Sequence, residues 1–135
     1  MLLTDGHGTP ISIHVDSASP HEVKLIEILV MTMLVLARRR TKLIYDKAAD
    51  SDPLRRRLSN GYGLTLIAPY RKHKGMPRKR LTERQRKLYR HRYKIERTNA
   101  WMKWYRRLQV RQEYHSHLYK GFWMLGFVFT MLKAF

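Results

Sequence analysis

An almost wholly apolar run, ILVMTMLVLA over Ile28–Ala37, constrains the fold of this chain more than any other feature. Ahead of it, Ser19, Pro20 and Glu22 have the spacing of a capping box with proline at the first helical position. Together they predict a helix over about 20–37. A helix that is apolar on every side is stable only inside a domain, where other elements pack around it. The run is far shorter than the ~20 residues that span a bilayer, so we expect a core helix and no membrane role.

Short β-prone runs and further helix signals surround this helix. We expect a hairpin over 2–4 and 11–15, strands over 42–45 and 64–68, a capped helix over 53–58, a basic loop at about 70–82, and helices over about 83–108 and 118–133. This order predicts a single mixed α/β domain. A two-stranded start makes a poor edge for an independent sheet, so we also expect that at least one strand is missing upstream.

The charge of the chain points to a polyanionic partner. Its 28 Lys and Arg outnumber its 10 Asp and Glu and give a formal net charge of +18. Self-repulsion of this size is costly unless a polyanion neutralises it, which favours nucleic acid first and an anionic membrane surface second. The sequence has no cysteine, which favours an intracellular, cytoplasmic setting.

Tyr89, Arg92, Glu96 and Lys103 follow one another at spacings of three, four and seven. On an α-helix these offsets place all four side chains within an arc of roughly 60°. Arg107 falls close to the same face. One carboxylate among cations suits a group that holds a metal ion while its neighbours hold phosphates. Asp46 directly follows a predicted strand, so a sheet and a packed helix could bring these two distant carboxylates together.

Each of these residues also has a simpler interpretation. Glu96 could only form an ion pair with Arg92 on a solvated helix, and Asp46 could only cap a turn. The basic run over 71–92 could be a solvated surface. Trp104 lies near the Glu96 face and is a candidate for stacking on bases, whereas core packing is expected for Trp101 and Tyr105. His115 and His117 lack a third ligand nearby, so they make a weak metal site.

The same residues resemble a known family, the DDE transposases of bacterial insertion sequences. Tyr89, Arg92, Glu96 and Lys103 fill every place of the Tyr-x2-Arg-x3-Glu-x6-Lys signature that marks one large branch. The segment LIYDKAADSDPLRRRL is similar to the branch's second-aspartate segment, with Asp46 as the matching acid. VDSASPHEVKLIE and ERTNAWMKWYRRLQVR are also similar to the family and occur in the expected order.

The resemblance implies a ribonuclease H-like mixed sheet with flanking helices, and metal-dependent cutting and joining of transposon ends. It implies that Asp46 and Glu96 are catalytic ligands of Mg²⁺ or Mn²⁺. Residues expected near DNA are Tyr89, Arg92, Lys103, Arg106 and Arg107. The family's first catalytic aspartate lies on a strand before the hairpin, and neither Asp5 nor Asp16 matches it.

We therefore expect a C-terminal portion of the catalytic domain, over residues 1–135, that lacks the first strand and the first catalytic aspartate and is inactive alone. Mg²⁺ or Mn²⁺ is expected to bind only when the missing aspartate is supplied. Its expected partners are DNA (transposon ends and target) and an N-terminal transposase fragment or another copy of itself. Its expected location is the bacterial cytoplasm, at the nucleoid. The alternative is a noncatalytic, basic DNA-binding remnant of a transposase, whose DNA affinity would depend on salt and not on Mg²⁺.

Overall fold

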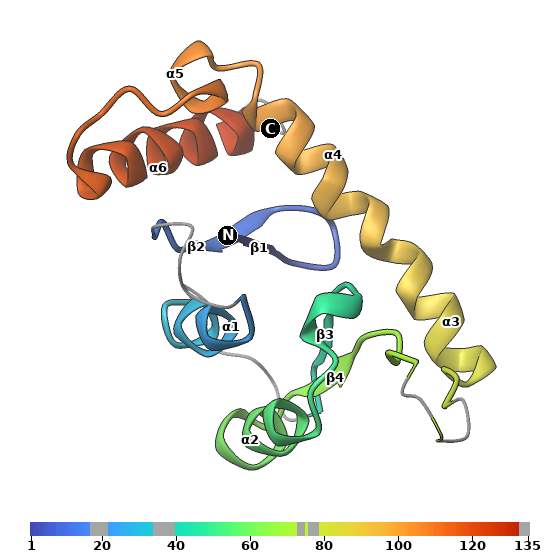
Figure 1. Cartoon of the computed structure of the whole chain (residues 1–135). Helices are drawn as coiled ribbons and strands as arrows, with labels where there is room; N and C mark the ends of the chain where they lie inside the picture. Colours follow the sequence, from blue (N-terminus) through green and yellow to red (C-terminus); the bar gives the residue numbers. More distant parts are fainter. Residues whose placement is uncertain (17–21, 34–39, 73–74, 76–78, 133–135) are drawn as a thin grey trace.

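The structure is a computed structural model of the whole chain, and residues 1–16, 22–33, 40–72, 75 and 79–132 are described below (Figure 1). The elements are β1 (Leu2–Thr4), β2 (Pro10–Ile13), α1 (Glu22–Met31), β3 (Lys42–Ile44), η1 (Lys47–Ala49), α2 (Asp52–Tyr62), β4 (Thr65–Ile67), α3 (Glu83–Tyr89), η2 (Arg90–Arg92), α4 (Tyr93–Met102), α5 (Arg106–Gln109) and α6 (Ser116–Leu132). The predicted mixed α/β class and the predicted strands are confirmed. Among the described residues, no helix is long and apolar enough to cross a membrane.

Two small sheets form the centre of the molecule. β1 and β2 pair antiparallel, with Leu2 opposite Ile13. In the turn between them, the Asp5 carboxylate accepts hydrogen bonds from the backbone N–H groups of His7 and Thr9, at 2.8 Å each. β3 and β4 pair parallel, with Leu43 opposite Leu66. A parallel pair needs a crossover, and η1 with α2 supplies it. In the described residues β1 pairs only with β2, and β3 only with β4.

Apolar side chains from the two faces of the β1–β2 hairpin enter two different cores. Leu3 packs with Ile26 and Val30 of α1, in a core that also includes Leu43 and the buried leucines of α2. Leu2 and Ile13 pack in the second core, which α4, α5 and α6 complete with Met102, Leu108 and Phe127. Because side chains alternate along a strand, α1 and the C-terminal helices lie on opposite faces of the hairpin.

The helices α3 and α4, with η2 between them, form one continuous rod along the side of the molecule (Figure 1). Thr82 begins it with a capping box to Gln85. The prediction of one helix over 83–108 is wrong at its C-terminal end, since α4 stops at Met102 and Tyr105 is extended (φ −78°, ψ 112°). The break allows α5 to turn back and pack Leu108 against α6.

Two other predicted helices differ at their ends. α2 continues through Asn60 and Gly61 to Tyr62 and ends at Gly63, whose φ of +63° suits a residue without a side chain. The predicted helix over 20–37 is present as α1, which ends at Met31. Its predicted cap at Ser19 and Pro20, and residues 34–37, lie outside the described residues.

Candidate active site

Three residues of the predicted motif meet on the α3–α4 rod. The Arg92 guanidinium donates from both Nε (3.2 Å) and Nη2 to Oε1 of Glu96, and from Nη1 to the Tyr89 hydroxyl at 3.3 Å. The hydrogen bond to Glu96, and after it the one to Tyr89, raises the pKa of Arg92 above its usual value. The Glu96 side chain is 58% exposed and the Arg92 side chain 36%, so this pair adds little to stability. The predicted common face is confirmed for these three side chains.

Asp46 lies at the C-terminal end of β3, where the chain leaves the sheet. Its backbone is extended and its carboxylate accepts a hydrogen bond from the N–H of Ala48 at 2.7 Å, which caps η1. Asp46 therefore does cap a turn, as the simpler interpretation expects. Leu43 and Tyr45 pack in the α1–α2 core, so alternation along the strand turns Ile44 and Asp46 towards the other face.

Asp46 and Glu96 line the same cavity, although one follows a strand and the other lies on a helix much later in the chain. The cavity has a volume of about 370 Å³, and its walls come from four segments. These are Met1–Gly6 around β1; Ile26, Leu29 and Val30 of α1; Lys42–Asp46 around β3; and the part of the rod that carries His91, Arg92, Ile95 and Glu96. Tertiary structure thus brings together the two acids that the sequence marked separately.

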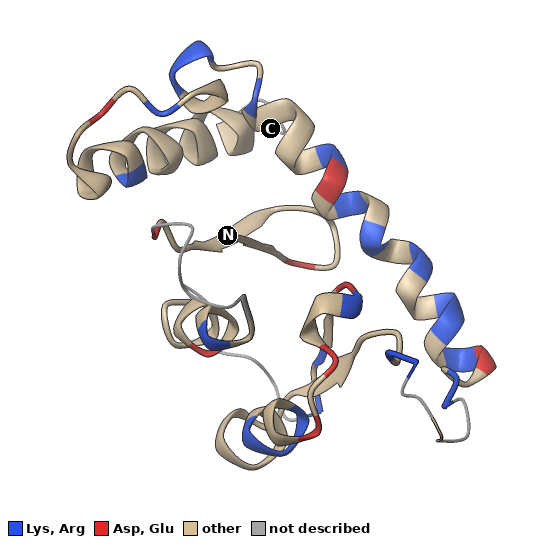
Figure 2. Ribbon diagram, viewed as in Figure 1, with Lys and Arg blue, Asp and Glu red and all other residues tan. Residues whose placement is uncertain are grey.

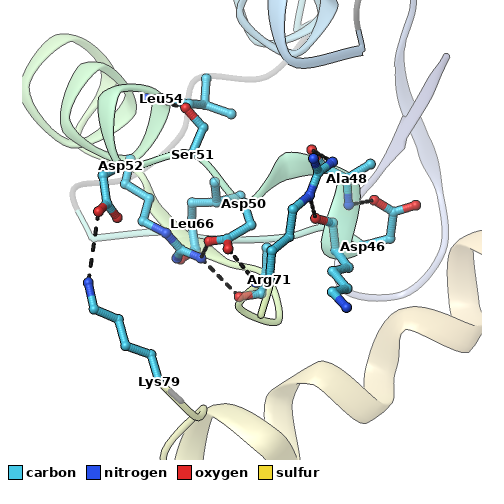
Figure 3. Close-up of polar contacts among 12 residues, drawn as sticks. Asp46, Ala48, Asp50, Ser51, Asp52, Leu54, Leu66, Arg71 and Lys79 are labelled. Carbon is cyan, nitrogen blue, oxygen red and sulfur yellow. Dashed lines mark hydrogen bonds and ion pairs between the residues drawn. The ribbon is translucent and has the colours of Figure 1, made fainter. Parts of the chain in front are cut away.

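A buried polar network holds the Asp46 turn in place (Figure 3). The Asp50 side chain, only 8% exposed, accepts from Nη2 of Arg55 at 3.0 Å and from the backbone N–H of Arg71 at 2.5 Å. Arg55 also donates to the carbonyls of Leu66 and Ala68, both at 2.9 Å. Arg55 therefore ties the turn to the end of β4.

Arg71 adds a second clamp on the same turn. Its guanidinium donates to the carbonyl of Lys47 at 3.2 Å and to that of Ala48 at 3.0 Å, within η1 itself. Sequence reasoning missed Asp50, Arg55 and Arg71. The available signal was that Asp50 directly precedes the N-cap of α2 and that Arg55 follows within this helix.

Of the other predicted DNA-binding residues, Lys103 lies at the C-terminal end of the rod, and Arg106 and Arg107 follow the break. Lys103 is exposed at the C-terminal end of α4, and Arg106 is exposed on α5. Arg107 donates to Glu113 at 3.3 Å, and its guanidinium lies 4.9 Å from the centre of the Phe122 ring. The expectation that Arg107 shares the Glu96 face is wrong, because it assumed an unbroken helix. Arg106 and Arg107 lie on α5, which packs against α6.

The exposed aromatic residues are partly as predicted. Trp104 is 84% exposed, as a base contact requires, and Tyr105 packs in the second core. Core packing of Trp101 is a wrong prediction, since this side chain is 47% exposed and its ring lies 4.8 Å from the guanidinium of Arg97. The rings of His115 and His117 stack on each other. In the described part of the chain, no three His, Cys, Asp or Glu side chains are close enough together to hold a metal ion.

Comparison with known proteins identifies the same family that the sequence motif resembles. The family model described as the transposase DDE domain matches residues 1–131. A protein of Burkholderia cepacia, named "Putative transposase for insertion sequence element IS402", is 29% identical over 132 residues, which cover 93% of this chain and 58% of that relative. The chain therefore spans less than two thirds of the length of the curated relative it matches. No solved structure matches the chain.

Proposed function

Since the chain belongs to the transposase DDE domain family, we propose that it is the C-terminal part of a ribonuclease H-like catalytic domain that cuts and joins DNA at the ends of an insertion sequence. One observation carries this proposal. Asp46 and Glu96, distant in sequence, line a single cavity, and Arg92 lies beside Glu96 in its wall. Carboxylates that converge from a strand end and a helix are what phosphate chemistry with divalent metal ions requires.

The donor set fits Mg²⁺ or Mn²⁺. Mg²⁺ is bound in proteins through one or two carboxylates, with waters and substrate phosphates as the other ligands, and Asp46 with Glu96 supply the two carboxylates. When bound, such ions activate the attacking oxygen and stabilise the leaving oxygen at phosphorus. To reach an ion, Asp46 can use the carboxylate oxygen that does not accept from Ala48, and Glu96 must share its carboxylate with Arg92.

A third carboxylate comes, on this proposal, from outside residues 1–135. Asp5 also lines the cavity, but its Oδ1 accepts two backbone hydrogen bonds that hold its own hairpin turn, and we assign it a structural role. The partners are accordingly an N-terminal transposase fragment, or self-association, together with transposon ends and target DNA. The setting is the bacterial cytoplasm, at the nucleoid.

The remaining motif residues anchor the DNA backbone. Tyr89 and Glu96 hold the Arg92 guanidinium between them, and like any arginine it is charged at neutral pH. Cations continue along the rod away from Glu96 (Figure 2). Its exposed members are Arg84, Arg86, Lys87, Arg90 and Arg97. Phosphates bound by these exposed cations would add to the contact that we propose for Lys103, Arg106 and Arg107.

Metal titration tests the assignment directly. With an N-terminal fragment present to supply the third carboxylate, binding of Mn²⁺, followed by water proton relaxation, should weaken at least about tenfold in Asp46→Asn and in Glu96→Gln, because each loses one charged ligand. Glu83→Gln is the matched control, since Glu83 is an exposed acid on the same rod, with its carboxylate 3.6 Å from Lys87. Equal binding by all four proteins would contradict the assignment.

The chain alone should not cleave DNA in Mg²⁺. Robust turnover by the purified chain that Glu96→Gln abolishes would show that two carboxylates suffice, and would end the proposal of a missing ligand.

The alternative is a noncatalytic DNA-binding remnant. One observation favours it, because both acids already have partners: Asp46 caps η1 and Glu96 pairs with Arg92. On this alternative, DNA affinity falls steeply with salt, with a slope near −0.9 for each phosphate contacted. It is then unchanged by Mg²⁺ and by Asp46→Asn, whereas on the leading proposal Mg²⁺ strengthens DNA binding only when Asp46 is intact.

A further inference from the structure

Helix α6 is apolar on two opposite sides, and only one of them is buried. Gly126 and Phe127 are buried on the side that packs against α4 and α5. The opposite side, which we call the outer face, exposes six large apolar residues to solvent. These are Leu118, Met124, Leu125, Val128, Phe129 and Leu132, which are between 37% and 64% exposed. A surface helix normally carries polar residues on its solvent side, so an apolar outer face indicates a partner.

The outer face has the residue spacing of a stripe through which helices pair. Leu118, Gly121, Leu125, Val128 and Leu132 follow one another at intervals of three, four, three and four residues. This heptad spacing keeps the five positions within an arc of about 80°, and it is the pattern by which two helices pack side by side. At Gly121 an added Cβ atom would meet nothing within 4 Å, so a second helix can approach the backbone closely there.

The charge distribution favours this face for contact between two copies of the chain. The formal net charge of +18 makes two copies repel each other when their basic surfaces meet. In α6, Lys120 is the one charged residue among 17. Figure 2 shows the contrast with the α3–α4 rod, which carries Lys and Arg along its length. Lys120 lies roughly 110° around the helix from the centre of the stripe, so it stays at the edge of a contact made there.

The exposed area suits a weak, specific dimer. The six apolar residues leave about 600 Å² exposed, at the upper end of what the largest apolar patch of a monomer reaches. Two such patches in contact bury about 1,200 Å², which is the lower limit for a specific protein interface. We therefore expect a dissociation constant in the micromolar range.

We propose that the outer face of α6 binds the same face of a second copy, with the two helices side by side across a two-fold axis near Leu125. A two-fold axis brings identical patches together, and Leu125 is the middle position of the stripe. The pairing is independent of the proposed function, because α6 carries none of the candidate site residues and contributes no described residue to the cavity. A failure of the dimer and a failure of the metal assignment are therefore separate results.

Sedimentation equilibrium of the intact chain, between about 1 and 300 µM, measures the association. We expect a reversible dimer that tightens between about 0.1 and 0.5 M NaCl, because salt screens the repulsion between two cationic copies. Leu125→Glu should weaken the dimer at least about tenfold, because it brings two like charges together at the axis. Met31→Glu is the matched control, since Met31 is 70% exposed on α1, and it should leave the dimer unchanged.

A cross-linking experiment does not depend on how well the glutamate variant folds. The chain has no cysteine, so Leu125→Cys introduces a single thiol beside the proposed axis. A disulfide requires two Cα atoms within about 7 Å of each other, which the axis provides at this position. Mild oxidation should therefore join two copies of Leu125→Cys at least about tenfold faster than two copies of the control Met31→Cys.

Four results would overturn the inference. A chain that stays monomeric over the whole concentration range would leave the outer face to a segment outside residues 1–135. A dimer that weakens as salt is added would point to contact through charged groups. Equal association of the two glutamate variants, or equal cross-linking of the two cysteine variants, would place the contact elsewhere on the molecule.

Discussion

Replacing Asp50 by Ala should destabilise the chain far more than replacing any exposed acid. The Asp50 carboxylate is 8% exposed, and its loss leaves the Arg55 guanidinium, itself 18% exposed, without its counter-ion. The Nε atom of Arg55 is buried and has no hydrogen-bond partner even in the intact network. Removing one partner of a buried ion pair costs about 3–5 kcal/mol. Arg55 keeps the carbonyls of Leu66 and Ala68, so we expect the low end, about 3 kcal/mol.

Asp52→Ala is the matched control, two residues further along the chain. Asp52 is 65% exposed and lies 3.8 Å from Lys79, so its loss should cost no more than about 1 kcal/mol.

Urea unfolding followed by circular dichroism measures both changes. With a slope of ~1.5 kcal/mol per molar urea, the midpoint should fall by about 2 M for Asp50→Ala and by less than about 0.7 M for the control. If the two variants unfold within about 0.5 kcal/mol of each other, the network does not hold the Asp46 turn.

Two further substitutions test the packing that positions the rod. Gly126→Ala should cost about 1–3 kcal/mol of stability, because a Cβ atom there would lie 2.5 Å from Cε of Met102. Gly121→Ala is the control in the same helix, where a Cβ atom meets nothing within 4 Å, and it should stabilise the chain. Thermal melts compare the two variants, and equal melting temperatures would contradict close packing at Gly126. Thr98→Val should cost about 1–3 kcal/mol in the same assay, since the buried Thr98 hydroxyl donates to the carbonyl of Gly8 at 2.6 Å and its loss leaves that carbonyl without this donor. A change below about 0.5 kcal/mol would contradict a stabilising role for this hydrogen bond.

Local patterns in the sequence were enough to predict most elements and one part of the site. The strands need only short apolar runs between turn residues, and the spacing of Tyr89, Arg92 and Glu96 needs only helical periodicity, because hydrogen bonds within a helix are local. The family resemblance rested on the same local spacing and is confirmed by the family match over residues 1–131.

Two predictions that required knowledge of distant packing failed. No nearby residue marks the end of α4 at Met102; the chain turns there because Leu108 and Tyr105 pack against α6, which comes later in the sequence. Trp101 was expected to pack in that core, and it is instead exposed beside Arg97.

By itself, then, the sequence determined that Asp46 follows a strand and that Glu96 belongs to a helical row with Arg92 and Tyr89. Only the tertiary structure decided that both acids line one cavity, and that Asp50 with Arg55 and Arg71 clamps the Asp46 turn. The physical reason is the distance along the chain over which each interaction acts. Backbone dihedrals and helical periodicity act over a few residues, whereas the walls of the cavity come from residues 1 to 99 and meet only when the two cores are packed.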